Sequence, residues 1–146
     1  MQKSYIVIIA AVVIAFGIVA VIIATSELTD AYHQNMVQES TMDTIASFDG
    51  DLMSVMLTEG EYYSFVLSED LTTILAHPRS ELVDTQTTAL KTADISVEEM
   101  LEELSSYGSV WIEYEFFNPE TGMIEHKTTY LEKHDKYVFG AGYYSP

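Results

Sequence analysis

Two side chains in this 146-residue chain have the chemistry to hold an anion, and both lie in or beside apolar, strand-like segments. His77 directly precedes Pro78, which favours an extended backbone, and its imidazole can hydrogen-bond a carboxylate. Lys127 is the only basic residue inside an expected strand, so it is the natural counter-ion for an anionic ligand. Each residue also has an alternative interpretation as a structural residue that binds no ligand. His77 would then tie its loop to the sheet, and Lys127 would pair across the sheet with Glu113 or Glu115.

Tyrosines in the same segments add hydroxyl groups that can orient a ligand: Tyr63, Tyr114, Tyr130 and Tyr143. A small-molecule pocket is usually mostly apolar and carries a few such polar groups. Ordinary packing in a core or between strands explains each tyrosine as well. We expect a small anionic solute, with Lys127 as its charge partner and His77 and Tyr130 as orienting donors.

Catalytic and metal chemistry find little support in the residue pattern. There is no cysteine, and the four histidines show no metal-ligand spacing. The run Glu98–Glu103 is typical of a solvated helix face, and Asp49-Gly50-Asp51 lacks the further ligands of a calcium loop. No nucleophile elbow, P-loop or dinucleotide fingerprint occurs. We therefore expect no enzyme, no metal and no cofactor.

Charge is distributed very unevenly along the chain. All 23 acidic residues lie at or beyond Glu27, where only five basic residues accompany them. Such a field repels phosphates, which argues against a nucleic-acid partner. It also repels anionic solutes at long range. A cationic amine is thus the alternative ligand, with Asp94 or Glu113 as its recognition group.

Residues 5–24 are twenty uncharged, mostly apolar residues, enough for a helix of roughly 30 Å. Lys3 precedes this run and Glu27 follows it, so we predict a transmembrane anchor at 1–25 and an extracytoplasmic domain at 26–146. A cleaved secretory signal is the alternative, although its apolar region is usually shorter. Small residues recur along one stripe of the run: Ala10, Gly17, Ala20 and Ala24. They are common in any membrane helix, but they also allow close approach of a second helix, from a homodimer or a membrane-protein partner.

The remaining pattern predicts one small α+β domain. The membrane helix is expected to continue into a long helix at 26–48, which has no Gly or Pro. A second helix is expected at 96–106. Five β-strands are expected, at 62–67, 71–77, 110–117, 124–132 and 137–144. They should form one antiparallel sheet covered by the long helix. Gly140 and Gly142 leave one sheet face bare, which should mark the close approach of another segment.

Five short stretches, in this order, resemble the landmarks of single Cache domains. They are Ile74–Pro78 with Glu81–Val83, Asp94 after the loop, Trp111–Tyr114 with Asn118-Pro119, Lys127–Tyr130, and Gly140–Tyr144. The resemblance implies a PAS-like extracytoplasmic sensor module of chemoreceptors and sensor kinases, which usually binds small organic acids or similar solutes. It also implies that His77 lies at the mouth of the pocket.

Two departures from the family pattern affect the loop between the strands. Asp84 and Ile95 stand where the family has glycines, so we expect this loop to be reshaped. In the family's receptors a second membrane helix and a signalling domain would follow Pro146. We therefore expect output through a membrane partner. The alternative function is a structural or accessory subunit of a membrane or cell-surface complex, in which side chains from 79–95 plug the pocket.

Overall fold

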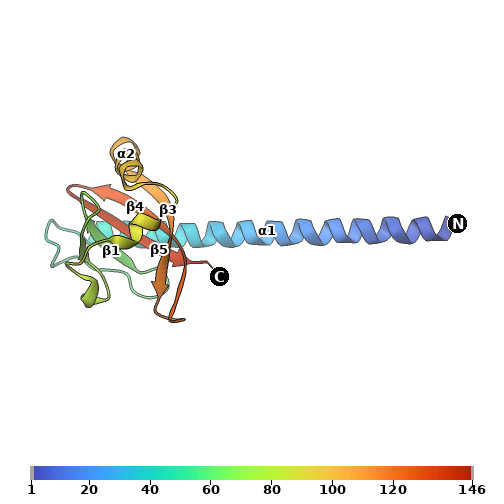
Figure 1. Cartoon of the computed structure of the whole chain (residues 1–146), viewed down its shortest axis with the longest axis horizontal. Coiled ribbons are helices and arrows are strands. Elements are labelled where there is room, and N and C mark those ends of the chain that lie inside the picture. Colours follow the sequence, from blue (N-terminus) through green and yellow to red (C-terminus); the bar gives the residue numbers. More distant parts are fainter. Residues whose placement is uncertain (1, 146) are drawn as a thin grey trace. The chain divides into compact units, whose positions relative to one another are not determined.

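The computed structural model describes the backbone of residues 2–145 and the side chains of residues 25–145 (Figure 1). The chain divides into two compact units, Met1–Gln34 and Asn35–Pro146. Helix α1 spans Gln2–Ser47, which agrees with the expectation that the first helix continues into a long one. Among the residues searched, no helix is long and apolar enough to cross a membrane. The anchor expected at 5–24 falls where side chains are not described.

The second unit contains a five-stranded antiparallel sheet in the order β2-β1-β5-β4-β3. Its strands are β1 (Ser64–Ser68), β2 (Ile74–Ala76), β3 (Ser109–Asn118), β4 (Met123–His134) and β5 (Tyr137–Tyr144). The predicted α+β architecture is therefore confirmed. Only β2 is much shorter than expected, because Asp70 Oδ1 accepts the Thr72 backbone N–H at 3.1 Å in a turn where Leu71 has a positive φ of 60°.

Helix α2 (Val97–Tyr107) begins and ends at strong local signals. Ser96 Oγ accepts the Glu99 backbone N–H, and Glu99 Oε2 accepts the Ser96 backbone N–H at 2.8 Å, which forms a capping box. Gly108 closes the helix in the left-handed conformation, with φ of 82°. The helix packs on β3 and β4 through Met100 and Leu104, both buried.

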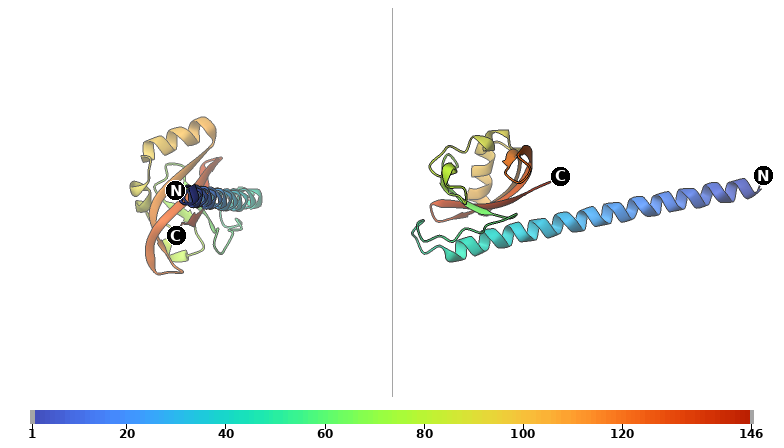
Figure 2. Two further views of the ribbon diagram at one scale, coloured as in Figure 1. Left: turned by 90° about the vertical axis from the view of Figure 1, so that its right-hand side faces the viewer. Right: turned by 90° about the horizontal axis from the view of Figure 1, so that it is seen from below.

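Hydrogen-bonded register divides the sheet's side chains between two faces, as the two-residue period of strands requires. One, called here the cavity face, carries Phe65, Tyr114, Lys127 and Leu131, with α2 and two 3-10 helices, η1 (Ser80–Leu82) and η2 (Thr88–Thr92), on its side (Figure 2). The other, called the helix face, carries Trp111, Tyr130, Ala141 and Tyr143, which pack with Val37 of α1. The end of α1, from Asn35 to Ser47 within the second unit, thus covers one face of the sheet, as predicted for the long helix.

Hydroxyl groups tie the end of α1 to the start of β1 within the second unit. Ser40 Oγ donates to the Tyr62 carbonyl at 2.6 Å, and Thr44 Oγ1 donates to Ser64 Oγ at 2.6 Å. Phe48, just past the helix, packs against Phe139 with ring centroids 5.4 Å apart. These contacts fix the end of α1 against the helix face of the sheet.

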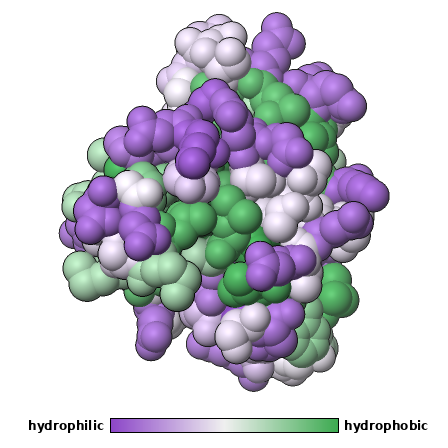
Figure 3. Space-filling view, turned by 90° about the vertical axis from the view of Figure 1, so that its left-hand side faces the viewer, coloured by the Kyte–Doolittle hydropathy of each residue, from purple (hydrophilic) through white to green (hydrophobic). Residues whose placement is uncertain are grey.

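Gly140 and Gly142 both lie on the cavity face, and the space over them is filled by atoms of the neighbouring strands β1 and β4, not by a separate segment as expected. A Cβ at Gly140 would lie 2.7 Å from Leu131 Cδ2, and a Cβ at Gly142 would lie 2.8 Å from Lys127 Cε. The missing side chain at Gly142 therefore leaves room for the aliphatic part of Lys127. On the face shown in Figure 3, an apolar area lies between hydrophilic side chains.

Candidate functional site

A cavity of about 330 Å³ lies on the cavity face of the sheet. Strands β1 to β4 and the segment after β2 contribute its lining, which consists of Tyr63, Phe65, Leu67, Ile74, His77, Leu82, Thr85, Gln86, Thr87, Thr88, Ala89, Leu90, Tyr114, Phe116 and Lys127. The lining is mostly apolar and aromatic, with a few polar groups. This composition and this volume are those of a small-molecule site.

Lys127 is buried in this cavity, with 1% of its surface exposed. Its Nζ donates to the Tyr63 hydroxyl oxygen at 2.7 Å. Aromatic rings surround the nitrogen, with centroids 4.2 Å away for Tyr63, 5.2 Å for Phe116, 5.3 Å for Tyr144 and 5.5 Å for Phe65. Cation–π attraction partly offsets the loss of hydration.

None of the ion pairs found among residues 25–145 involves Lys127. The pairing with Glu113 or Glu115 that the sequence left open is not formed. Both carboxylates are on the opposite face, where they contact His126 at 3.2 Å and 3.8 Å. Register explains this, because Lys127 lies opposite Tyr114 and not opposite either glutamate.

Burial is the main cause that lowers the pKa of Lys127, from 10.5 to about 7, and the positive charge of Arg79 adds to it. The guanidinium of Arg79 lies about 6 Å from the ring centroids of Phe116 and Phe117. At neutral pH the amine and ammonium forms of Lys127 are thus about equally populated.

His77 lies beside Lys127 and takes one defined tautomer. Its Nδ1 accepts the backbone N–H of Arg79 at 2.9 Å, which leaves the proton of the neutral ring on Nε2. Burial is the largest cause that lowers its pKa to about 4, followed by the charges of Lys127 and Arg79. The ring packs against Tyr63 and Phe65. His77 therefore both ties its loop to the sheet and presents a neutral donor to the cavity.

Residues 85–90 form one wall of the cavity, and the start of this segment, residues 84–87, lies along β2. Ile74 N–H donates to the Thr85 carbonyl at 3.0 Å, Asp84 N–H donates to the Ile74 carbonyl at 2.8 Å, and Thr73 bridges Gln86. Asp84 has a positive φ of 63°, so it adopts the conformation that a glycine at this position would favour. Thr85–Leu90 line the cavity and do not plug it, since the open volume remains beside them.

Two of the predicted site residues lie on the wrong face for this cavity. Tyr130 and Tyr143 belong to the helix face, where Tyr130 donates to Glu132 Oε2 at 2.8 Å and both pack near Val37. Tyr130 is three residues from Lys127 in the same strand, so the two side chains must point to opposite sides. Grouping them in one site was an error of strand parity.

Asp94 also lies outside the cavity lining. Its backbone N–H donates to the Glu113 carbonyl and its Oδ1 accepts the Glu113 N–H, at 2.9 Å and 2.8 Å. It therefore pairs with the outer edge of β3. Of the predicted site residues, Tyr63, His77, Tyr114 and Lys127 are brought together.

Sequence reasoning missed several aromatic neighbours of Lys127, above all Tyr144. Tyr144 lies directly opposite Lys127 in the β4–β5 register, and Phe65 and Phe116 complete the ring cluster. The alternation in Gly140–Tyr144 places Tyr144, and not Tyr143, on the face of the two glycines. That parity was the available signal.

Comparisons with known proteins identify the family and the fold. A family model described as a Cache domain matches residues 10–145. A search among curated proteins found no match. Solved structures also share the fold, among them the following three. A methyl-accepting chemotaxis protein from Vibrio parahaemolyticus has a TM-score of 0.59 and 18% identity, with 82% of this chain and 92% of that chain covered.

The second structure is a Cache chemosensory domain described for its recognition of carboxylic acids. It has a TM-score of 0.55 and 15% identity, over 84% of this chain and 97% of that one. The third is the periplasmic sensor domain of a chemotaxis protein, with a TM-score of 0.50 and 14% identity, over 84% and 94%. At these identities the likeness concerns the fold.

Proposed function

This chain belongs to the Cache domain family, and on that premise we propose that it is a membrane-anchored, extracytoplasmic binding module for a small carboxylate. The anchor would be residues 5–24, and the ligand-bound state would be passed to a membrane partner. The family's domains in chemotaxis receptors are sensory modules, which supports a sensing role. A carboxylic acid is the ligand class of one structural relative.

The observation that carries the carboxylate proposal is the buried ammonium of Lys127, which has no carboxylate partner among the described residues. Leaving such a charge unpaired costs several kcal/mol, and a ligand carboxylate would remove that cost. His77 Nε2–H and the Tyr63 hydroxyl are the nearby donors that would orient it. Arg79 raises the local potential, which opposes the repulsion of anions by the acidic surface.

The cavity lining also indicates the kind of carboxylate. Its remaining walls combine Phe, Leu, Ile and Ala side chains with the polar run Thr85–Thr88, and Lys127 is the only Lys or Arg among its lining residues. A monocarboxylate with a short apolar body would pair its charge with Lys127 and place its apolar part against the apolar side chains of the lining. A dicarboxylate would find no second Lys or Arg in the lining for its other charge.

Isothermal titration calorimetry of the full-length chain against short monocarboxylates and matched amines tests the proposal. We expect carboxylate binding that Lys127→Met abolishes. Tyr130→Phe is the matched control, because Tyr130 lies on the other face, and it should bind as the parent does. Amine binding that survives Lys127→Met would contradict the proposal, and the absence of any ligand would favour the accessory-subunit role.

A further inference from the structure

The same lysine has a second chemistry that anion binding does not use. A lysine that is buried, lines an open cavity and lies beside a proton-carrying hydroxyl has the features of a reactive amine. We infer that Lys127 captures small aldehydes and ketones covalently, its Nζ condensing with the carbonyl carbon to form an imine inside the cavity. This goes beyond the proposed function, because it requires no carboxylate on the ligand.

Three features of the geometry support the amine as a nucleophile. Lys127 Nζ donates to the Tyr63 oxygen at 2.7 Å, so this contact leaves the nitrogen lone pair of the neutral form uncommitted. The surrounding rings of Tyr63, Phe116 and Tyr144 disfavour water around the nitrogen. The imine that results is neutral, so it suits this apolar environment better than an unpaired ammonium does.

The protonation state agrees with this geometry. Since its pKa is lowered to about 7, roughly half of Lys127 is unprotonated at neutral pH. An exposed lysine, with a pKa near 10.4, is unprotonated in roughly one molecule in 3,000 at that pH. The ionisable groups that face or contact Lys127 are Tyr63, His77, Arg79, Tyr114 and Tyr144. None of them is a carboxylate.

The condensation balances with the groups at hand. Nζ forms a bond to the carbonyl carbon, and one amine proton passes to the carbonyl oxygen to give a carbinolamine. The C–O bond then breaks and the oxygen leaves as water. It takes the second proton from the Tyr63 hydroxyl, which recovers a proton from the nitrogen that it contacts. Burial raises the pKa of Tyr63, so its hydroxyl keeps its proton and acts as a relay. No oxidant or reductant is consumed.

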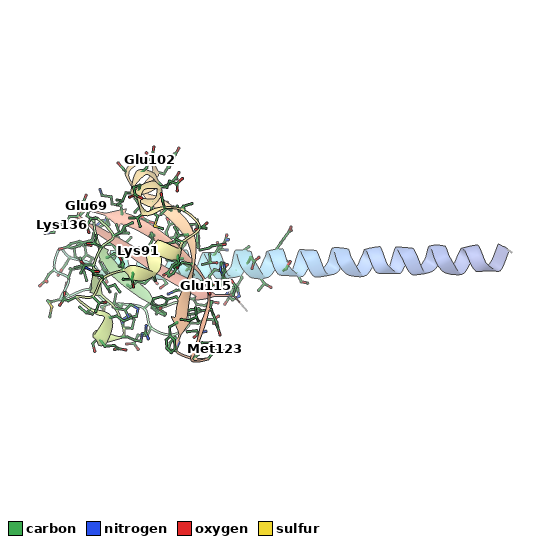
Figure 4. The ribbon with its side chains drawn as sticks, viewed as in Figure 1. Glu69, Lys91, Glu102, Glu115, Met123 and Lys136 are labelled. Atoms are coloured by element: carbon green, nitrogen blue, oxygen red, sulfur yellow. The ribbon has the colours of Figure 1, made fainter. Side chains whose placement is uncertain are left out.

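Reductive trapping on the full-length chain in mild detergent tests the inference. The chain is treated at neutral pH with limiting propanal and then with sodium borohydride, which reduces a neutral imine to a stable secondary amine. Intact mass spectrometry should show the addition of one propyl group, and peptide mapping should locate it at Lys127. Lys91 and Lys136 are exposed internal standards in the same sample (Figure 4).

We expect labelling at Lys127 to exceed that at Lys91 and Lys136 by at least about tenfold. Lys127→Met should lose the preferred label, whereas Lys136→Met should keep it. Tyr63→Phe should slow labelling at Lys127 by about tenfold or more while leaving its position unchanged, because the relay is lost. Equal labelling of all three lysines, or none at Lys127 in the parent chain, would overturn the inference.

Butyrate, a carboxylate without a carbonyl carbon that can condense, separates this inference from the proposed function. If butyrate binds and protects Lys127 from propanal, both hold. Trapping at Lys127 without butyrate binding supports the inference and counts against the proposed function. Butyrate binding without trapping supports the proposed function and overturns the inference.

Discussion

Both faces of the sheet bury large side chains, but the helix face is packed against the end of α1 whereas the cavity face retains open volume. On the helix face, Tyr130 and Tyr143 pack with Val37 of α1, and Phe139 packs with Phe48 just past that helix. Hydroxyl pairs such as Thr44 with Ser64 are internally satisfied. On the cavity face, a buried lysine lines unfilled volume, and the aliphatic part of that lysine packs over Gly142. The difference shows that burial alone does not identify a core residue. Phe139 and Lys127 are nearly equally buried, but only Phe139 has its bonding and packing completed by the chain itself.

The largest change in stability is expected from a substitution that removes packing on the helix face. Phe139 is fully buried, and its ring contacts Phe48 with centroids 5.4 Å apart. Phe139→Ala should lower the free energy of unfolding by about 3–5 kcal/mol, because the cavity it creates is far from any ligand that could refill it. Chemical denaturation measures this. A loss below about 1 kcal/mol would mean that the helix face is not the structural core.

On the cavity face, a substitution is expected to raise the free energy of unfolding instead of lowering it. Lys127→Met replaces a buried amine with an apolar side chain of similar size, so it should raise the free energy of unfolding at neutral pH by about 2–4 kcal/mol. Below pH 7 the penalty of the parent chain is fully present, since the folded pKa of Lys127 is about 7 and its ordinary value is 10.5. Between these values the unfolded chain holds the extra proton, so the parent gains stability as pH rises.

The difference between Lys127→Met and the parent should therefore shrink from pH 7 toward about pH 10. Lys136→Met is the control, because Lys136 is exposed in the β4–β5 turn and should show no such trend. Unfolding curves at three pH values suffice. A difference that is constant with pH would contradict the account of Lys127 as an uncompensated buried amine.

The smallest changes in stability are expected when one tyrosine hydroxyl is removed from each face. Tyr63→Phe removes the acceptor of the Lys127 Nζ bond and should cost about 1 kcal/mol, because that acceptor is buried beside an amine. Tyr130→Phe removes a bond to a partly exposed glutamate and should cost less than about 0.5 kcal/mol. Thermal unfolding of both variants measures the pair, and a reversed order would count against the functional distinction between the faces.

Most of the fold could be predicted from the sequence, because alternation, turn residues and capping signals act locally. The last strand was located correctly at 137–144, and α2 within one residue at each end, since its Ser96–Glu99 box and Gly108 are explicit signals. β2 was overestimated because the hydrogen bonds of Asp70 extend the turn into the apolar run.

The site could be predicted only in part. Tyr63, His77, Tyr114 and Lys127 were identified by residue type, and they meet in one cavity. Tyr130 and Tyr143 were assigned wrongly because the face of a residue depends on its parity relative to Lys127. The wall at residues 85–90 could not be placed, because it is held by non-local backbone pairing with Thr72–Ile74 that no periodicity encodes.

The segment that forms the cavity wall also guards the sheet against aggregation. An edge strand is open to pairing with another chain unless something covers it. Here residues 84–87 pair with the edge strand β2, and Asp94 pairs with the edge strand β3. Any motion that lifts residues 84–87 to admit a solute therefore also bares a strand edge. If a solute enters by this route, ligand exchange and exposure of a strand edge occur together. A sensor built in this way is safest from self-association when its wall is closed.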